Sequence, residues 1–331
     1  VLQFAGAHPE LSEAIHDAAQ QYQAIAAEFP ALLEMDEEAQ CAAIQEGFVN
    51  FYSSDAVNPY VALTARGPWI ITLKGAMAKP QAMANIMTPS ISQLRLTHAL
   101  RAEIGRTRDN CPYSRFLCLN SGSESVTLAC RIVDIHAKLQ TEPGAPHAGK
   151  TIKHLAVKGA FHGRTEGPAR YSDSSRNAYL KHLASYRGDE SLLIVEPYNV
   201  QQLRDIFAKA EAQGWFIEAM FLEPVMGEGY PGRGVTPEFY AAARELTAAH
   251  GSLFLVDSIQ AGLRAHGVLS VVDYPGFESL PAPDMETYSK ALNAGQYPLS
   301  VLAVSEKVAG LYRTGVYGNT MTTNPRAMDV A

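Results

Sequence analysis

Hydrophobic and polar positions divide the chain into an N-terminal part with helical spacing and a longer part where strands and helices alternate. In the first part, apolar residues recur at helical intervals within segments rich in Ala, Gln and Glu. This pattern predicts helices over residues 11–29, 36–51 and 90–104. Two β-rich runs within residues 59–74 flank Arg66-Gly67-Pro68, which predicts a β-hairpin.

From residue 115 onward, short apolar runs alternate with helical segments. The candidate strands are Phe116–Leu119, His154–Val157, Leu192–Val195, Ala219–Leu222, Leu253–Val256 and Leu299–Val304. Strands of this kind that alternate with helices are typical of a mostly parallel sheet covered on both faces. We therefore predict an α/β fold, with residues 1–88 forming a helical segment and hairpin of a small α+β domain and residues 89–331 a large domain.

Three helices between the strands have clear signals. The helix after Ser125 is expected to have Leu128, Ile132, Ile135 and Leu139 on one face. A second helix is expected over residues 200–212. The third begins with Thr236-Pro237-Glu238, a capping residue followed by proline, and ends at Gly251.

Composition and charge exclude several classes of protein. The 331 residues are 47% hydrophobic and 18% charged, which is a globular composition. The net charge is −7 without a basic run, so no nucleic-acid partner is expected. No apolar stretch approaches 18 residues, so no membrane span is expected. The four cysteines lack metal-type spacing, so we expect no metal site and a reducing, cytoplasmic location.

Two residues at the ends of predicted strands suggest one chemistry above others. Asp257 follows the run Leu253–Val256, and Lys290 follows a short stretch that ends in Tyr288-Ser289. A lysine can form a Schiff base with an aldehyde cofactor, and a carboxylate can keep a pyridine nitrogen protonated. An acid directly after four large apolar residues needs a partner. The alternative for Asp257 is a simple cap of the next turn.

Two further segments follow predicted strands and could bind a cofactor. Ser121, Gly122 and Ser123 open a helix, where N–H groups and hydroxyls can bind a phosphate. An ordinary N-cap turn is the simpler interpretation of that segment. In the next loop, Phe161 could stack on a flat ring beside His162, or it could be a packed aromatic residue next to a surface histidine.

Acidic and hydroxyl side chains occur in the remaining two segments. Glu223 and Glu228 stand in a loop with Pro and Gly after the run Ala219–Leu222, and they could orient a cofactor or neutralise a cation. A solvated acidic loop is the alternative. The segment Gly318–Pro325 contains Thr320 and offers hydroxyls and a turn, which are equally consistent with a plain threonine-rich loop.

Taken in order, these segments resemble the class III (ω-type) pyridoxal-phosphate-dependent aminotransferases of fold type I, over about residues 59–329. The resemblance implies pyridoxal 5'-phosphate as the cofactor of residues 89–331. Catalytic roles would fall to Lys290, which would carry the Schiff base, and to Asp257, which would pair with the ring nitrogen. The implied cofactor-binding residues are Ser121, Gly122, Ser123, Phe161, His162, Glu223, Gln260 and Thr320.

The resemblance also implies the surroundings of the cofactor. Gly122 and Ser123 would hold the phosphate, Phe161 would stack on the ring and Gln260 would lie near the phenolic oxygen. Glu228 would be the substrate-site residue, matching a glutamate that pairs with a substrate-binding arginine in some members. Thr320 would reach the phosphate of a neighbouring subunit, which implies a homodimer with shared active sites.

The sequence departs from the family pattern at several positions. Ser258 stands where the family usually has Glu, and Thr322 and Thr323 stand where two glycines are common. The family's glycine-rich loop is shortened or missing around residues 75–79. The C-terminal small domain, with its arginine for the substrate carboxylate, is absent from this sequence, and we expect that it was omitted.

The implied reaction is transfer of an amino group from an amino acid or amine to a keto acid or aldehyde by a ping-pong mechanism. An aminomutase, racemase or decarboxylase of the same fold would use the same residues. A non-catalytic family member that acts as a binding or assembly subunit is a further alternative, although retention of Lys290, Asp257 and the Ser-Gly-Ser turn argues against it. A dinucleotide enzyme is disfavoured because no GxGxxG follows a strand.

Overall fold

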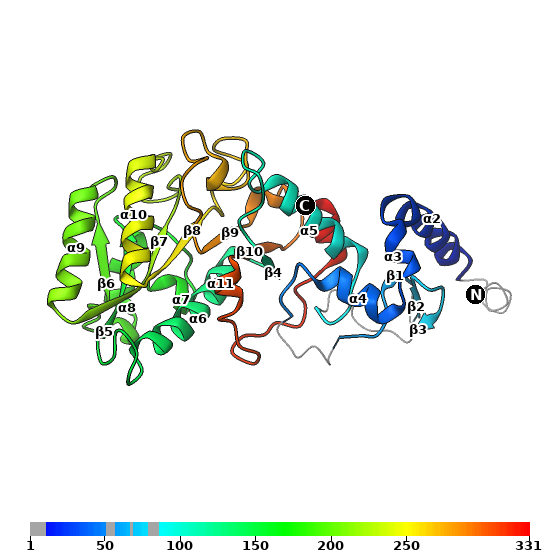
Figure 1. Cartoon of the computed structure of the whole chain (residues 1–331), viewed down its shortest axis with the longest axis horizontal. Coiled ribbons are helices and arrows are strands. Elements are labelled where there is room, and N and C mark those ends of the chain that lie inside the picture. Colours follow the sequence, from blue (N-terminus) through cyan, green and yellow to red (C-terminus); the bar gives the residue numbers. More distant parts are fainter. Residues whose placement is uncertain (1–10, 51–56, 67–68, 79–85) are drawn as a thin grey trace. The chain divides into compact units, whose positions relative to one another are not determined.

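The computed structural model describes residues 11–50, 57–66, 69–78 and 86–331. The chain forms two compact units, and one of the two boundaries between them, at residues 99–100, falls within a helix. Figure 1 shows the elements of both units. One unit combines residues 1–99 with residues 318–331, and the other contains residues 100–317. The predicted boundary between residues 88 and 89 stays a prediction.

The first unit consists of helices around a small antiparallel sheet. Its elements are α2 (Ser12–Glu28), α3 (Pro30–Glu34), α4 (Glu37–Gln45), β1 (Ala62–Arg66), β2 (Trp69–Thr72), β3 (Met77–Ala78), the first part of α5 (Ile91–Glu103) and α12 (Pro325–Val330). Strands β1 and β2 pair antiparallel, with Arg66 opposite Trp69, which confirms the predicted hairpin. Residues 67 and 68 of its turn lie outside the described residues.

Two predictions in this unit need correction. The helix predicted over residues 36–51 ends at Gln45, and Phe48 forms an isolated bridge instead. The short helix α3 was not expected. Its first residue is Pro30, whose fixed backbone angle suits the first position of a helix, so the chain turns after Phe29 and starts again. Around residues 75–79, where the glycine-rich loop was expected to be shortened or missing, Met77–Ala78 form the short strand β3 against β2, and residue 79 lies outside the described residues.

The second unit is built on one seven-stranded sheet. Its strands are β4 (Arg115–Leu119), β5 (Thr151–Val157), β6 (Leu192–Val195), β7 (Trp215–Leu222), β8 (Leu253–Asp257), β9 (Met285–Tyr288) and β10 (Ser300–Val304). They lie in the order β4-β10-β9-β8-β7-β5-β6. Only β10 runs antiparallel to its neighbours β4 and β9, so the sheet is mostly parallel, as predicted.

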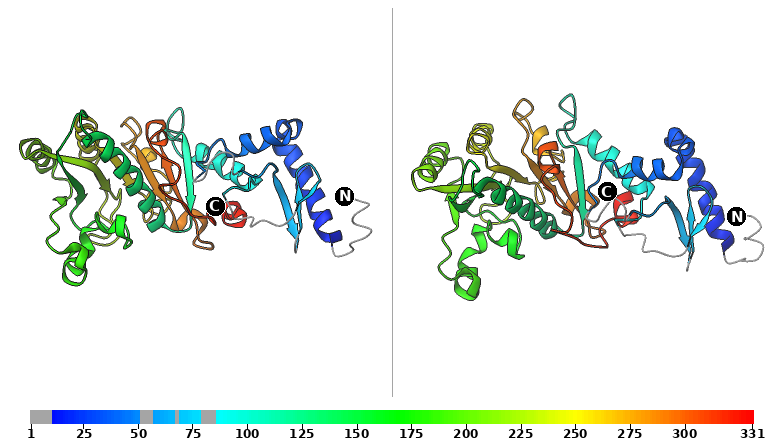
Figure 2. Two further views of the ribbon diagram at one scale, coloured as in Figure 1. Left: turned by 90° about the horizontal axis from the view of Figure 1, so that it is seen from below. Right: turned by 60° about the horizontal axis from the view of Figure 1, so that its bottom comes forward.

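Helices connect the strands and cover the sheet. They are α6 (Gly122–Thr141), α7 (Glu166–Ala169), α8 (Asp173–His182), α9 (Val200–Ala212), α10 (Pro237–His250) and α11 (Glu306–Ala309), with short 3-10 turns at Ala184–Tyr186, Val271–Asp273 and Lys290–Asn293. The chain moves across the sheet in one direction through α6 and back through α9 and α10. Because such crossovers are right-handed, α6 lies on one face and α9 and α10 on the other (Figures 1 and 2).

The caps of α10 follow the sequence signals. The side chain of Thr236 accepts a hydrogen bond from the N–H of Phe239, and Pro237 is the first helical residue. The helix ends at Gly251, whose φ of 78° lies in the left-handed region that glycine adopts without strain.

The buried face of α6 differs from the prediction. Leu128 and Ile132 are buried in the core, but Ile135 is only half-buried and Leu139 is 49% exposed. Towards the end of the helix, His136 and Ala137 take the inward positions. At about 100° per residue, the four predicted positions lie within about 60° of one another around the axis, so they form one stripe. The buried residues centre to one side of it, on Ala129, Val133 and His136, which leaves Ile135 and Leu139 at the edge of the buried face.

Candidate active site

Ten of the eleven residues proposed for cofactor and substrate line one cavity of about 420 Å³ in the second unit. The cavity lies where the carboxyl ends of β5, β7, β8 and β9 meet the start of α6. Loops that follow parallel strands share one edge of a sheet, which is why segments far apart in sequence converge there. The ten residues are Ser121, Gly122, Ser123, Phe161, His162, Glu223, Glu228, Asp257, Gln260 and Lys290.

The cavity has further walls that sequence reasoning did not identify. Gly163, Gly227, Ile259 and Ser289 also line it. Each is a neighbour of a predicted residue, and small or apolar walls carry no chemical signal of their own. Thr320 belongs to the other compact unit, with residues 318–331, so its predicted role stays a prediction.

The start of α6 is organised as an anion site. Ser121 is the N-cap, and its hydroxyl accepts a hydrogen bond from the N–H of Glu124 at 3.3 Å. The carboxylate of Glu124 turns back and accepts from the N–H of Asn120 at 2.8 Å. The N–H groups of Gly122 and Ser123 are in the first turn, so the helix supplies no acceptor for them. They remain available to an anion at the positive end of the helix dipole.

Gly122 also permits a close approach of two site segments. A Cβ atom at this position would lie 2.7 Å from Cδ1 of Ile259. The absence of a side chain therefore allows the start of α6 to pack directly against the loop that follows Asp257.

Asp257 and His162 form a buried pair at the base of the cavity. Nδ1 of His162 lies 2.9 Å from Oδ2 of Asp257, and both side chains are almost fully buried. The other carboxylate oxygen, Oδ1, accepts from the N–H of Ile259 at 3.1 Å and from the hydroxyl of Thr287 at 3.2 Å. These contacts fix the orientation of the carboxylate. The partner that the sequence required for Asp257 is therefore, within the chain, His162.

The second ring nitrogen of His162 is in apolar surroundings. Nε2 is buried and has no hydrogen-bond partner among the described residues, and the ring meets Phe221 edge-on with centroids 5.7 Å apart. A hydrogen on Nδ1 lets the imidazole donate to Oδ2 of Asp257.

Glu223 ties two loops of the site together. Its carboxylate accepts from the N–H of Phe161 at 2.8 Å and from the N–H of Gly227 at 2.9 Å, and it is buried. Burial raises the pKa of Glu223 and nearby Asp257 adds to this, whereas His162 and the two N–H groups lower it. The solvated acidic loop considered for this segment is therefore wrong at Glu223, although Glu228 is exposed.

Arg164 was not among the expected site residues. Its guanidinium lies over the ring of Phe161, 4.7 Å from the centroid, and its Nη2 is 3.7 Å from Oε1 of Glu228. Both charged side chains are exposed, so the ion pair is weak and can open at little cost. The spacing Phe-His-Gly-Arg could have indicated this residue, because the arginine follows the proposed stacking ring by three positions.

Lys290 has an unusual backbone conformation at the end of β9. Its φ is 45°, a left-handed value that is uncommon for a residue with a side chain and costs on the order of 1–3 kcal/mol. The surrounding turn holds it, since the carbonyl of Lys290 accepts from the N–H of Gly295 at 3.0 Å. The exposed side chain donates from Nζ to Oε1 of Gln260. Strain of this kind is concentrated at functional sites.

The structure shows the contacts or burial of the residues that depart from the family pattern, Ser258, Thr322 and Thr323. The hydroxyl of Ser258 donates to the buried carboxylate of Glu286 on the neighbouring strand at 2.5 Å. In the first unit, Thr322 and Thr323 are buried, and the side chain of Asn324 accepts from the N–H of Arg326 at the start of α12.

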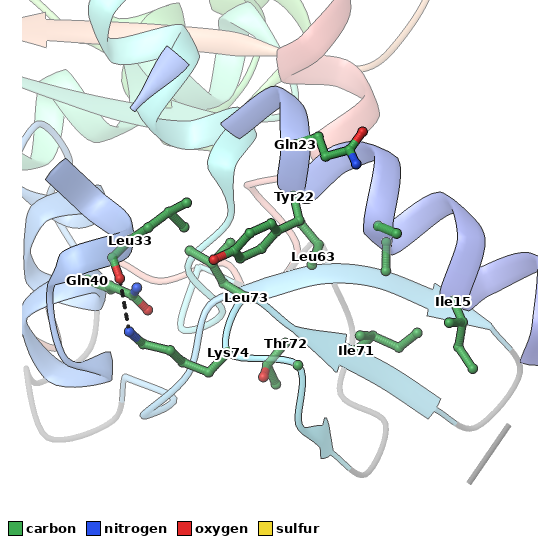
Figure 3. A pocket seen from close by; sticks show the side chains of 13 residues that line it. Ile15, Tyr22, Gln23, Leu33, Gln40, Leu63, Ile71, Thr72, Leu73 and Lys74 are labelled. Carbon is green, nitrogen blue, oxygen red and sulfur yellow. Dashed lines mark hydrogen bonds between the residues drawn. The ribbon is translucent and has the colours of Figure 1, made fainter. Parts of the chain in front are cut away.

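A second cavity, of about 560 Å³, lies in the first unit between α2, the β1–β2 hairpin and α4 (Figure 3). Its walls are mainly apolar, including Ile15, Leu63 and Ile71. The lysine at its edge, Lys74, donates to the carbonyl groups of Leu33 and Met35. None of the residues predicted to carry chemistry lines this cavity. Although it is larger, we assign the chemistry to the cavity around Lys290.

The described residues contain no group of three or more His, Cys, Asp or Glu side chains suited to a metal ion. Within the same residues, no helix combines the length and the apolar character needed to span a membrane.

The fold and the site place the chain among the class III aminotransferases: the model of the family "Aminotransferase class-III" matches residues 70–331, and the chain belongs to this family. A similar curated protein is ornithine aminotransferase 2 of Staphylococcus saprophyticus, 33% identical over 219 residues. That match covers 66% of this chain and 50% of the relative. The chain thus spans about half the length of the curated relatives it matches.

Solved structures agree on the fold, which is that of the fold-type-I pyridoxal-phosphate transaminases. A crystal structure of an (S)-enantioselective ω-transaminase from Thermomicrobium roseum aligns with a TM-score of 0.56 at 20% identity, covering 82% of this chain and 67% of that one. The ornithine aminotransferase of Toxoplasma gondii ME49 aligns with a TM-score of 0.54 at 21% identity, covering 92% and 72%.

Class III aminotransferases use pyridoxal phosphate, and the cavity has the groups that this cofactor requires. The start of α6 offers two N–H groups to a phosphate, and Asp257 is a buried, oriented carboxylate for a ring nitrogen. Lys290 brings a primary amine into the same cavity. The cofactor therefore fits the donors and acceptors that line this cavity.

Proposed function

We propose that this chain carries the cofactor site of a pyridoxal-phosphate-dependent aminotransferase. The enzyme would move an amino group from an amino acid or amine to a keto acid or aldehyde in two half-reactions. The observation that supports this most is the convergence of the Lys290 amine and the buried Asp257–His162 pair on one cavity that opens at the start of α6.

The cofactor, when bound, supplies an aldehyde that reacts with amines and a ring that accepts an electron pair. The chain supplies everything else. The N–H groups of Gly122 and Ser123, with the hydroxyls of Ser121 and Ser123, would hold the phosphate. Phe161 would stack on the ring, and Glu223 fixes that phenylalanine through its N–H.

Asp257 and Lys290 have complementary roles in proton transfer. Asp257 would keep a proton on the ring nitrogen, because its contacts with His162 and Thr287 fix the orientation of its carboxylate. Lys290 would hold the cofactor through its amine, and Nζ would be the group that moves a proton at the carbon bearing the substrate's amino group. Gln260, which binds Nζ in this structure, would lie near the phenolic oxygen.

The pair Arg164–Glu228 supports a substrate that carries a carboxylate. Arg164 is a cation beside the ring of Phe161, and its ion pair with Glu228 is exposed. An incoming carboxylate could replace Glu228 as the partner of Arg164, whereas a substrate amine would favour Glu228. Because the similar curated proteins are named ornithine aminotransferases, a diamino acid is the first donor to test.

We also propose a homodimer in the cytoplasm. The match of Thr320 to a residue that reaches a neighbouring subunit's phosphate supports shared active sites. The location is supported by the thiols: burial raises the pKa of Cys41 to about 11, and Cys118, also with a raised pKa, is likewise buried and unpaired.

The deciding experiment is an absorption spectrum of the full-length protein with added pyridoxal phosphate, followed by borohydride reduction and peptide mass analysis. We expect a cofactor band and a reduced adduct on Lys290. A folded protein with neither would rule the proposal out. Product analysis with an amino donor and pyruvate or 2-oxoglutarate then separates transamination from racemisation, decarboxylation or mutase chemistry.

A further inference from the structure

A buried carboxylate outside the cavity, Glu286, lies at the centre of a four-donor network. Glu286 is on β9, four residues before Lys290, and it is 0% exposed. Its Oε1 accepts from the hydroxyl of Ser258 at 2.5 Å and from the N–H of Val271 at 2.9 Å. Its Oε2 accepts from the hydroxyls of Ser270 at 2.5 Å and Tyr113 at 2.8 Å.

The buried carboxylate of Glu286 makes strong hydrogen bonds with its four donors. Within the described part of the chain, no lysine, arginine or histidine forms an ion pair with Glu286, so the four donors alone offset its desolvation. Burial raises the pKa of Glu286, and the four hydrogen bonds act in the opposite direction. Hydrogen bonds to a buried carboxylate are shorter and stronger than neutral ones. Each donor is therefore held firmly relative to β9.

One of the four donors belongs to the active-site loop. Ser258 directly follows Asp257, and Ile259 and Gln260, which come next, line the cavity. The same loop is joined to β9 by two more hydrogen bonds. The N–H of Ser258 donates to the carbonyl of Thr287 at 3.0 Å, and the hydroxyl of Thr287 donates to Asp257 at 3.2 Å.

The geometry points to Glu286 as a positioning residue: through the hydroxyl of Ser258 it fixes the turn from Asp257 to Gln260, and thereby the carboxylate that faces the cofactor ring. This inference rests on the proposed function. Among the described residues, the side chain of Glu286 accepts hydrogen bonds from Tyr113, Ser258, Ser270 and Val271, none of which lines the cavity. Of these four, Ser258 belongs to the active-site turn, so the proposed effect on the site passes through that hydroxyl. A site of this kind depends on supporting hydrogen bonds that hold its side chains in place.

Ser270 provides a matched control for Ser258. Both hydroxyls donate to Glu286 at 2.5 Å, and both side chains are buried, at 1% and 0% exposure. Ser270 does not line the cavity. The variants Ser258→Ala and Ser270→Ala therefore remove equivalent bonds to the same carboxylate, and only the first frees the active-site turn.

The experiment measures three quantities for the wild type and both variants of the full-length protein. These are the dissociation constant for pyridoxal phosphate added to the apo form, kcat and KM, and the thermal midpoint. We expect a lower thermal midpoint for both variants, since each loses one charged hydrogen bond, with the larger drop in Ser270→Ala, whose hydroxyl also accepts from the N–H of Val272 at 3.3 Å. Only Ser258→Ala should weaken cofactor binding, by about threefold to tenfold, and lower kcat by a similar factor with little change in KM.

Glu286→Gln gives a second measurement if Ser258→Ala folds poorly. The amide keeps the size of the side chain but loses the charge, and we expect weaker cofactor binding in the same range. The double variant Ser258→Ala/Glu286→Gln should add little to the larger single effect, because both act through one contact.

The outcomes are distinct. Equal cofactor affinity in the wild type and Ser258→Ala overturns the positioning role, and so does equal weakening in Ser270→Ala, which indicates a general packing role. A folded wild type that binds no pyridoxal phosphate overturns the proposed function itself.

Discussion

The two ends of strands β7 and β8 contain similar residue types in different surroundings. At the carboxyl ends, Asp257 and Glu223 surround the cavity with His162. At the amino ends, His250 accepts at Nε2 from the N–H of Ile217 at 3.2 Å, and its Nδ1 lies 3.0 Å from Glu211. Both ends thus combine a buried histidine with a carboxylate.

The surroundings of the two histidines differ: His250 is packed among aromatic rings, whereas His162 lines a cavity. His250 packs against the rings of Phe216, Phe207 and His147, with centroids 5.1 to 5.6 Å apart. Among the described residues, His162 meets one aromatic ring, that of Phe221, and it lines a cavity that also contains a strained lysine. A buried histidine–carboxylate pair is therefore no sign of function by itself. Open space and a strained backbone beside the pair are the informative features.

The largest effect is expected at the strained lysine. Lys290→Ala should lower turnover at least about a thousandfold and abolish the borohydride adduct, because it removes both the anchoring amine and the proton carrier. The thermal midpoint of the apo protein should change little, since among the described residues the side-chain hydrogen bond of Lys290 that is lost in alanine is that with Gln260. Lys158→Ala is the control, because Lys158 is exposed and paired with Glu196. Retained turnover in Lys290→Ala would contradict the assignment.

A pair of aspartates tests the comparison directly. Asp257→Asn should lower kcat by about 10² to 10⁴ with a modest change in stability, because a neutral amide cannot favour protonation of the ring nitrogen. Asp284, before β9, accepts from the N–H of Phe254 at 2.9 Å and pairs with Arg244 at 3.2 Å. Asp284→Asn should cost about 3 kcal/mol of unfolding free energy and leave kcat per folded molecule unchanged.

Kinetics and urea unfolding of the two variants check this. If Asp257→Asn lost much stability but kept a normal kcat, Asp257 would be a structural residue, and the assignment of chemistry to the carboxyl ends of the strands would be wrong.

The smallest effect is a pH dependence at the amino ends. Burial lowers the pKa of His250, as it does that of His136. As the pH falls below the ordinary value of 6.5, the unfolded chain takes up a proton that the folded chain resists, so the free energy of unfolding falls. Above that value this contribution is complete.

Urea unfolding at a series of pH values measures how the free energy of unfolding changes with pH. The series should run from about pH 5 to about pH 8, the range in which histidine titrates. His250→Gln should flatten this pH dependence, whereas the same change at the exposed His182 should not. An unchanged slope in His250→Gln would assign the pH dependence to other groups.

The sequence predicted the frame of the second unit well because its strands are short, apolar and separated by helices with clear caps. It did not supply bounds for β9, since Met-Glu-Thr-Tyr contains a glutamate within a strand that is entirely buried. The hydrogen-bond donors that offset the burial of the Glu286 carboxylate come from Tyr113, Ser258 and the segment at 270–271. Periodicity within one segment cannot reveal partners so distant in the chain.

The residues of the candidate site could be predicted from the sequence for a related reason. In a parallel sheet, every loop after a strand arrives at the same edge, so a list of polar residues after strands is already a candidate site. The hydrogen bonds between residues in that list could not be predicted from the sequence. His162 and Asp257 are 95 positions apart, and nothing in their spacing indicates a hydrogen bond. Arg164 was overlooked because a single exposed arginine has many uses.

The strand order has a consequence for synthesis of the chain. Strand β10 lies between β4 and β9, so β4, the first strand of this sheet to be made, finds no partner until residues 300–304 exist. At 5–20 residues per second, the ribosome needs on the order of ten seconds or more to reach them. During that interval β4 is an unpaired apolar edge that can join foreign strands. The hydroxyl of Ser300, which donates to the carbonyl of Ser121 at 2.7 Å, arrives with the strand that ends this exposure.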